Sequence, residues 1–139
     1  MELAKSCYYA IRGLLLLARQ PAPFPPMLLR DIAGGVKAPE AFMSKIFQNL
    51  RASRIVRSHR GRERGYSLAR PSGEISLYDI IVAMRGSAAL RSLALGPGVA
   101  GGVEVQLQEA WSDIEEQVVT ALKGRTLHGL LQNASPTSA

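Results

Sequence analysis

Arginine dominates one short stretch of this 139-residue chain. Six arginines lie between Arg51 and Arg64, and Glu63 is the one acid among them. Like charges held this close repel one another and lower stability unless a polyanion screens them. The planar donor fork of a guanidinium also fits the oxygens of a phosphate. The stretch therefore predicts a surface that binds a polyanion.

The balance of charge along the chain supports this interpretation. Residues 1–70 hold 13 Lys or Arg against 4 Asp or Glu, whereas residues 71–139 hold 4 against 7. This polarity favours a nucleic acid or an anionic membrane as the partner of the front half. No apolar run approaches the ~20 residues of a membrane span, and the first residues do not resemble a signal peptide. We therefore expect a cytoplasmic protein with no membrane segment.

The remaining reactive side chains form no recognisable catalytic or metal-binding set. His59 and His128 lie far apart, and Cys7 is the single cysteine, so neither a disulfide nor a metal site is expected. No Ser–His–Asp set or catalytic pair of carboxylates is recognisable. The sequence thus predicts no enzyme and no cofactor. Cys7 is a candidate redox switch, but its place on the apolar face of the first predicted helix favours a buried, inert thiol.

Two predicted helices open the chain. Residues 3–18 repeat apolar side chains every three to four positions, which is helical spacing. Four prolines within residues 21–26 must end this helix. A second, shorter helix is predicted over residues 27–35, and the pair Gly34-Gly35 is expected to close it.

A third helix is predicted within residues 39–54, because Pro39 suits a first helical turn. Its apolar face is more typical of core than of a cofactor pocket, and consists of Phe42, Met43, Ile46, Phe47 and Leu50. The other face carries donors and acceptors of the kind that read base edges, namely Ser44, Lys45, Gln48 and Asn49. Any exposed helix face is polar, so this face alone leaves both interpretations open.

A basic hairpin follows the three helices. The segments 55–59 and 66–70 read as strands, and Gly61 and Gly65 allow the tight turn between them. Three helices followed by a hairpin is the order of a winged helix-turn-helix, whose third helix enters the DNA major groove. The predicted fold is therefore mainly α with a small β-hairpin wing. The wing residues expected to contact double-stranded DNA are Arg57, His59, Arg60, Arg62 and Arg64.

The back half contains a long amphipathic helix. Ser76 and Asp79 form a capping box for a fourth helix, which Gly86 ends. The helix at 104–123 then carries an apolar stripe of Leu107, Trp111, Ile114, Val118 and Leu122. Little chain remains to cover this stripe, so a second copy is the expected cover and the stripe the expected dimer interface. The alternative is that the helix folds back on the first helices as ordinary core.

These elements give a domain division along the chain. We expect a winged helix-turn-helix domain at 1–86, a flexible Gly/Ala-rich loop at 87–103, the dimerisation helix and a short helix starting at Thr126 within 104–133, and a disordered tail at 134–139.

Several motifs follow one another in a characteristic order and cover nearly the whole chain: LAKSCYYAIRGLLLLA, DIA, IFQNLRASRIVRSHRG, GYSLARPSGEISLYDIIVAMRG and WSDIEEQVVTALKGRTLHGLL. In these motifs the chain resembles the family of IscR, NsrR and CymR, the Rrf-two family of dimeric bacterial winged-helix transcription regulators. The resemblance implies that the third helix recognises DNA, that the helix at 104–123 pairs two copies, and that Arg60 enters the minor groove. By this resemblance, five residues of this chain align with the helix positions that contact bases in the family: Pro39, Ala41, Phe42, Ser44 and Lys45.

Two departures from the family pattern qualify what the resemblance implies. Many members hold an iron–sulfur cluster through three cysteines before the dimer helix, but residues 87–103 contain no cysteine and no histidine. Cluster irons need such ligands, so no cluster is expected. The wing usually reads RG-x-GG, whereas this one reads RGRERG. Two charged residues thus replace glycines and add charge to the turn.

The function expected from these features is a homodimeric repressor that binds an inverted-repeat operator. Its signal would be an unknown small molecule, a protein effector, or thiol chemistry at Cys7. The alternative is a regulatory protein-interaction module that acts mainly through a partner enzyme.

Overall fold

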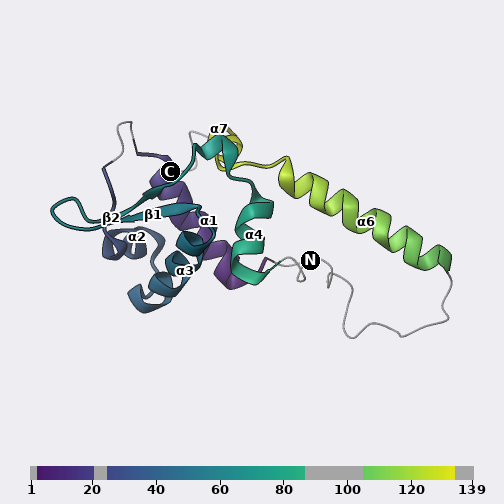
Figure 1. Ribbon diagram of the computed structural model, residues 1–139, viewed down its shortest axis with the longest axis horizontal. Helices are drawn as coiled ribbons and strands as arrows, with labels where there is room; N and C mark the ends of the chain where they lie inside the picture. Colours follow the sequence, from purple (N-terminus) through teal and green to yellow (C-terminus); the bar gives the residue numbers. More distant parts are fainter. Residues whose placement is uncertain (1–2, 21–24, 87–104, 134–139) are drawn as a thin grey trace.

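The computed structural model describes residues 3–20, 25–86 and 105–133. These residues confirm the predicted fold class, because they are mostly helical and contain one two-stranded antiparallel hairpin (Figure 1). The elements, in chain order, are α1 Lys5–Ala18, α2 Leu29–Val36, α3 Glu40–Ala52, β1 Val56–His59, β2 Gly65–Leu68, the 3-10 turn η1 Ser72–Glu74, α4 Leu77–Arg85, α6 Val105–Lys123 and α7 Leu127–Gln132. The predicted loop at 87–103 and the predicted tail at 134–139 lie outside the described residues.

The core forms where α1, α2 and α3 pack together beneath the hairpin (Figure 1). The apolar face predicted for α3 is buried, with Phe42 partly covered and the rest fully enclosed: Met43, Ile46, Phe47 and Leu50. Gly13 lets α1 approach α3 closely, since a Cβ there would lie 2.9 Å from the Phe47 ring. The spacing of apolar residues therefore sets which faces of these helices meet.

The boundaries of α2 differ from the prediction at both ends. Gly34 and Gly35 lie inside the helix, which continues to the buried Val36. Lys37 then adopts a left-handed conformation (φ 62°), and the Ala38 amide donates to the Ala33 carbonyl at 3.0 Å. The predicted closure by the glycine pair is thus wrong, because the helix continues one residue further, to the buried Val36, and Lys37 supplies the left-handed position that ends it.

The helix α2 starts later than predicted, because Met27 pairs with the sheet. The Met27 amide donates to the Tyr66 carbonyl at 2.9 Å, and the Tyr66 amide donates back to the Met27 carbonyl at 2.8 Å. This isolated bridge adds a second, short row of hydrogen bonds along the other edge of β2. The chain that leads into α2 is therefore tied to the turn-side end of β2.

The hairpin has the predicted location, with strands slightly shorter than expected. Val56 pairs with Leu68 and His59 pairs with Gly65 at the two ends of the ladder. Gly61 (φ 89°) and Gly65 (φ 134°) both have positive φ values, which glycine adopts without the penalty that a Cβ brings. The prediction that these two glycines shape the turn is confirmed.

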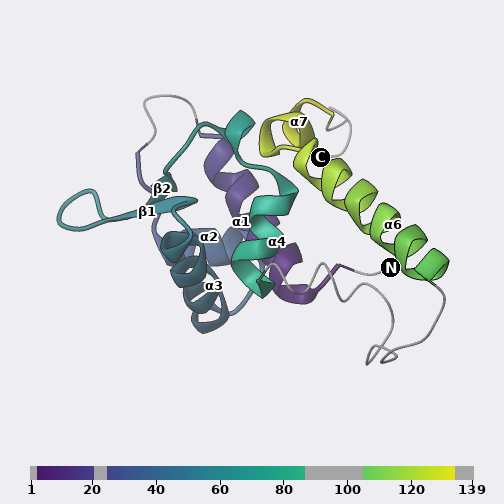
Figure 2. The ribbon, with the colours of Figure 1, turned by 45° about the vertical axis from the view of Figure 1, so that its right-hand side comes forward.

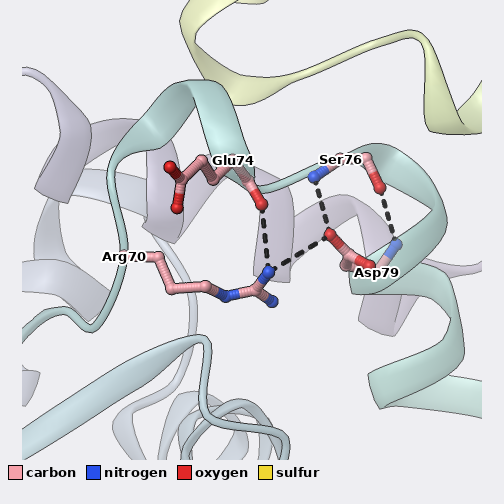
Figure 3. A network of polar contacts seen from close by, with 4 residues as sticks. All are labelled: Arg70, Glu74, Ser76 and Asp79. Atoms are coloured by element: carbon pink, nitrogen blue, oxygen red, sulfur yellow. Dashed lines mark hydrogen bonds and ion pairs between the residues drawn. The ribbon is translucent and has the colours of Figure 1, made fainter.

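The predicted capping box at the start of α4 is also confirmed. The Ser76 amide donates to Asp79 Oδ2 at 3.0 Å, and the Asp79 amide donates to Ser76 Oγ at 3.1 Å (Figure 3). Arg70, just after β2, joins the same network: its Nη1 donates to the Glu74 carbonyl at 3.0 Å and lies 3.7 Å from Asp79 Oδ2. The network links the end of the hairpin to the first turn of α4.

The short helix α7 packs on the first domain although the sequence grouped it with the long helix. Leu127 is fully buried in the common core, and its amide donates to the Ile75 carbonyl at 3.0 Å. The Leu77 amide in turn donates to the Arg125 carbonyl at 2.8 Å. The short helix predicted to start at Thr126 begins at Leu127, and Thr126 is its N-cap, whose side chain accepts a hydrogen bond from the Gly129 amide at 3.1 Å. The helix α7 thus packs on α1 and η1, while α6 projects from the body (Figures 1 and 2).

Candidate nucleic-acid interface

The solvent-facing side of α3 carries most of the predicted base-reading residues. Ala41, Lys45 and Gln48 are exposed, whereas Ser44 is half-buried. Gln48 Nε2 donates a hydrogen bond to Ser44 Oγ at 3.3 Å, one helical turn away. Asn49, also predicted on this face, is exposed as well, so the face offers the Lys45 ammonium and the amides of Gln48 and Asn49, with Ser44 partly engaged.

The predicted wing arginines are exposed, and they include Arg57, Arg60, Arg62 and Arg64. Within the part of the chain that the structure describes, no salt bridge engages any of them. Figure 1 shows the hairpin projecting beyond the helical body, beside α2 and α3. A guanidinium with no counter-ion in its own chain keeps its full attraction for an external anion.

His59 differs from the other predicted wing contacts. It is half-buried, and its Nε2 lies 2.7 Å from Ser67 Oγ on the neighbouring strand. This hydrogen bond ties one ring nitrogen of His59 to the neighbouring strand. Sequence reasoning did not identify Ser67 as a partner, because only the strand register places it beside His59.

Sequence reasoning counted Arg51 and Arg54 in the arginine-rich stretch without giving them a place in the interface, and it did not single out Arg70. Together with Arg57 they line an open hollow at the root of the hairpin, where α3 ends and β1 begins. The sequence shows that these arginines are close in number, but only the fold shows that Arg70, which follows β2, joins them. The basic surface is therefore larger than the wing alone.

The long helix α6 stands apart from the core. None of its residues is buried, and it packs on α4, where Lys123 Nζ lies 4.7 Å from the centre of the Tyr78 ring. Along the predicted dimer stripe, three side chains are half-buried, namely Trp111, Val118 and Leu122. The other two are open to solvent, with Leu107 56% and Ile114 46% exposed. This helix is therefore not ordinary core of a single copy.

Cys7 lies on the face of α1 that packs against the core, and only 1% of its surface is exposed. Burial raises the pKa of the Cys7 thiol, and this effect exceeds the lowering by the Ser6 hydrogen bond and by Arg85. A protonated, enclosed thiol is a poor nucleophile and a poor metal ligand.

The donor set does not fit an iron–sulfur cluster. Such a cluster is held by several thiolates or imidazoles, whereas Cys7 is the chain's single cysteine. Among the residues that the structure describes, no three His, Cys, Asp or Glu side chains gather where they would hold a metal ion. No described helix is both long enough and apolar enough to cross a bilayer.

Comparison with known proteins connects this geometry to a family. The Rrf2 family, whose description is "Iron-dependent Transcriptional regulator", matches residues 3–133. A helix-turn-helix-type transcriptional regulator of Mycobacterium tuberculosis is 34% identical over 137 residues, which cover 98% of this chain and 84% of that protein. The transcriptional regulator IscR of Xenorhabdus nematophila is 28% identical over 135 residues, with 96% and 80% covered.

Among solved structures, CymR, the global cysteine regulator of B. subtilis, shares the fold. It superposes with a TM-score of 0.80 at 23% identity, covering 97% of this chain and 99% of that one. The matching proteins are transcriptional regulators and not enzymes. The chain belongs to the Rrf2 family of transcriptional regulators, the same family that its motifs indicated.

Proposed function

We propose that this regulator binds double-stranded DNA as a homodimer and represses transcription from an inverted-repeat operator. The observation that carries the proposal is the exposed set of wing arginines, which form no salt bridge with any residue that the structure describes, beside the exposed polar face of α3. In a winged helix-turn-helix these two elements meet the backbone and the major groove of one half-site.

The residues divide into two roles. Lys45 and Gln48 reach base edges from α3, and Ala41 offers only an apolar contact. Arg60 and Arg62, at the tip of the wing, bind phosphates, and Arg60 reaches into the minor groove. Each phosphate contact releases counter-ions, so binding weakens steeply with salt.

The homodimer follows from the open stripe of α6. Leu107 and Ile114 are large apolar side chains exposed on one face of a helix that contributes nothing to its own core. A second copy of α6 would remove this face from water. Two wings carried on such a dimer address two half-sites about one helical turn, ~34 Å, apart.

The signal that regulates DNA binding is not sensed by an iron–sulfur cluster in this proposal, because the chain lacks the cysteines to hold one. We propose that a small molecule or a partner protein acts as effector. Cys7, enclosed in the core, is the weaker candidate for a thiol switch.

The test is binding of the full chain to DNA from upstream of its own gene, at several salt concentrations. The variant Arg60→Ala/Arg62→Ala is expected to bind more weakly and to show a shallower salt dependence, by up to about one unit of slope for each lost contact. Arg125→Ala is the matched control, because Arg125 is exposed but lies between α6 and α7, away from the wing.

Equal loss in the control and the wing variant would show that general charge, not the wing, drives binding. Unchanged binding by the wing variant would place the DNA contact elsewhere. A wild-type chain that binds no DNA would instead favour a role as a protein-interaction module.

A further inference from the structure

The hollow at the root of the wing has the composition of an anion site. It has a volume of about 680 Å³, and its lining contains no acidic residue. Four arginines and two serines surround it: Arg51, Arg54, Arg57, Arg70, Ser53 and Ser58. A concave surface lined by charges of one sign concentrates ions of the opposite sign.

Three of the four arginines have no counter-ion among the residues that the structure describes. Within the described part of the chain, Arg51, Arg54 and Arg57 take part in no salt bridge, and all three are exposed. Arg70 is the exception, because its Nη1 is held by the Glu74 carbonyl and by Asp79 (Figure 3). The hollow thus combines one fixed arginine in its wall with three uncompensated ones.

Arg54 occupies a backbone position at which arginine is costly. Its φ is 60°, in the left-handed region where a glycine usually ends a helix. The Arg54 amide donates to the Arg51 carbonyl and the Ile55 amide donates to the Leu50 carbonyl, both at 2.9 Å. Glycine would close α3 in the same way with less strain, so what Arg54 adds at this turn is its guanidinium.

The same turn removes an obstacle to anion binding. The free carbonyls at a helix C-terminus carry partial negative charge, which repels anions. Here two of the carbonyls in the last turn of α3, on Leu50 and Arg51, accept hydrogen bonds from the residues that follow the helix. The anion therefore meets guanidinium groups at this helix end.

The hollow also joins the two parts of the proposed DNA interface. Arg51 lies three residues beyond Gln48 on α3, which brings it to the end of the exposed polar face. Arg57 lies two residues before His59 on the outer side of β1. A DNA backbone that follows α3 toward the wing would pass over the hollow.

We propose that this hollow binds a phosphate group, supplied by the DNA backbone at the edge of each half-site. The source of the phosphate rests on the proposed function, whereas the phosphate chemistry rests on the hollow itself. A free phosphorylated molecule offers the same chemistry, so the experiment has one arm for each source.

The first arm uses DNA and the full-length variant Arg51→Ala/Arg54→Gly. We expect at least a tenfold loss of affinity for DNA from upstream of the protein's own gene. The salt dependence should become shallower by about one unit of slope per lost contact. In a hydroxyl-radical footprint of this variant, protection of the DNA should disappear at the outer phosphates of each half-site. Protection should persist at the phosphates that the other variant, Arg60→Ala/Arg62→Ala, no longer protects. Arg125→Ala again serves as the control.

The single variant Arg54→Gly separates binding from folding. Because glycine suits the left-handed position, this variant should unfold at the same or a higher temperature than the wild type while binding DNA more weakly. Weaker binding together with a lower melting temperature would show that Arg54 acts through the fold, and would count against the proposal.

The second arm titrates the chain with inorganic phosphate, against chloride at equal ionic strength, and follows the melting temperature. Phosphate should stabilise the wild type and not Arg51→Ala/Arg54→Gly. If only this arm responds, the phosphate comes from a free molecule and the DNA source is refuted. If the wild type binds no DNA, the proposed function fails, and the phosphate titration alone decides whether the hollow is a phosphate site. If neither arm distinguishes the variant from the wild type, the hollow is not a phosphate site.

Discussion

The two glycines of the wing should respond very differently to the same substitution. Both have positive φ, 89° at Gly61 and 134° at Gly65, so alanine is strained at either position. Their surroundings differ. A Cβ on Gly61 would meet no atom within 4 Å, whereas one on Gly65 would collide with the Met27 carbonyl and lie 3.0 Å from the Leu28 amide. Gly65 is therefore constrained by both backbone and space.

These contacts set the expected magnitudes. Strain alone costs about 1–2 kcal/mol, which is the expected loss for Gly61→Ala. The collision at Gly65 adds about 1–3 kcal/mol, as overpacking of a well-packed site does. It cannot be relieved by turning a side chain, because the obstacle is backbone that is hydrogen-bonded to Tyr66. We thus expect Gly65→Ala to lose about 2–5 kcal/mol in total.

Urea unfolding of the full-length variants, followed by circular dichroism, measures both losses. The two substitutions are chemically identical and lie on the same hairpin, so each serves as the control for the other. Equal destabilisation, or a larger effect at Gly61, would refute the conclusion that the bridge from Met27 to Tyr66 fixes the turn-side end of β2. Hydrogen exchange at the Tyr66 amide should also accelerate in Gly65→Ala alone.

Three further predictions concern other parts of the molecule. The variant Leu107→Ser/Ile114→Ser should sediment as a monomer where the wild type sediments as a dimer. Its monomer should be as stable as before, because both side chains are exposed. The control variant Glu116→Ser, on the opposite face of α6, should remain a dimer. Gly34→Ala should stabilise the fold by up to about 1 kcal/mol in urea unfolding, because Gly34 lies inside α2 with no atom near its missing Cβ. Since burial raises the pKa of Cys7, the wild type should lose stability relative to Cys7→Ala as pH rises above about 8.5, where the unfolded thiol releases its proton first.

The sequence predicted those parts of the fold that local patterns determine. The buried face of α3 followed from apolar spacing, and the start of α4 followed from Ser76 and Asp79, whose hydrogen bonds span three residues. The turn glycines followed from the need for positive φ. In each case the residues that form the feature are near one another in the chain, so their types and spacing were sufficient.

The sequence failed where distant residues decide the outcome. The glycine pair in α2 is locally a helix end, yet the buried contacts of Val36 extend the helix past it. Met27 belongs to a helical pattern, yet Tyr66, far along the chain, draws it into the sheet. The return of Leu127 to the core also depends on distant partners. Local preferences are weak and tertiary packing overrides them at these positions.

The same distinction separates folding from binding in the candidate site. The turn-side end of β2 is held by the two hydrogen bonds between Met27 and Tyr66, while no salt bridge within the described residues engages Arg60 or Arg62 at the tip. Substitution of Gly65 should therefore change stability first, and substitution of the tip arginines should change DNA affinity first. Removing tip arginines even relieves repulsion among like charges in the free protein. If substitution of an arginine weakens DNA binding and leaves the stability of the fold unchanged, the positive charge of that arginine therefore serves the ligand and not the fold.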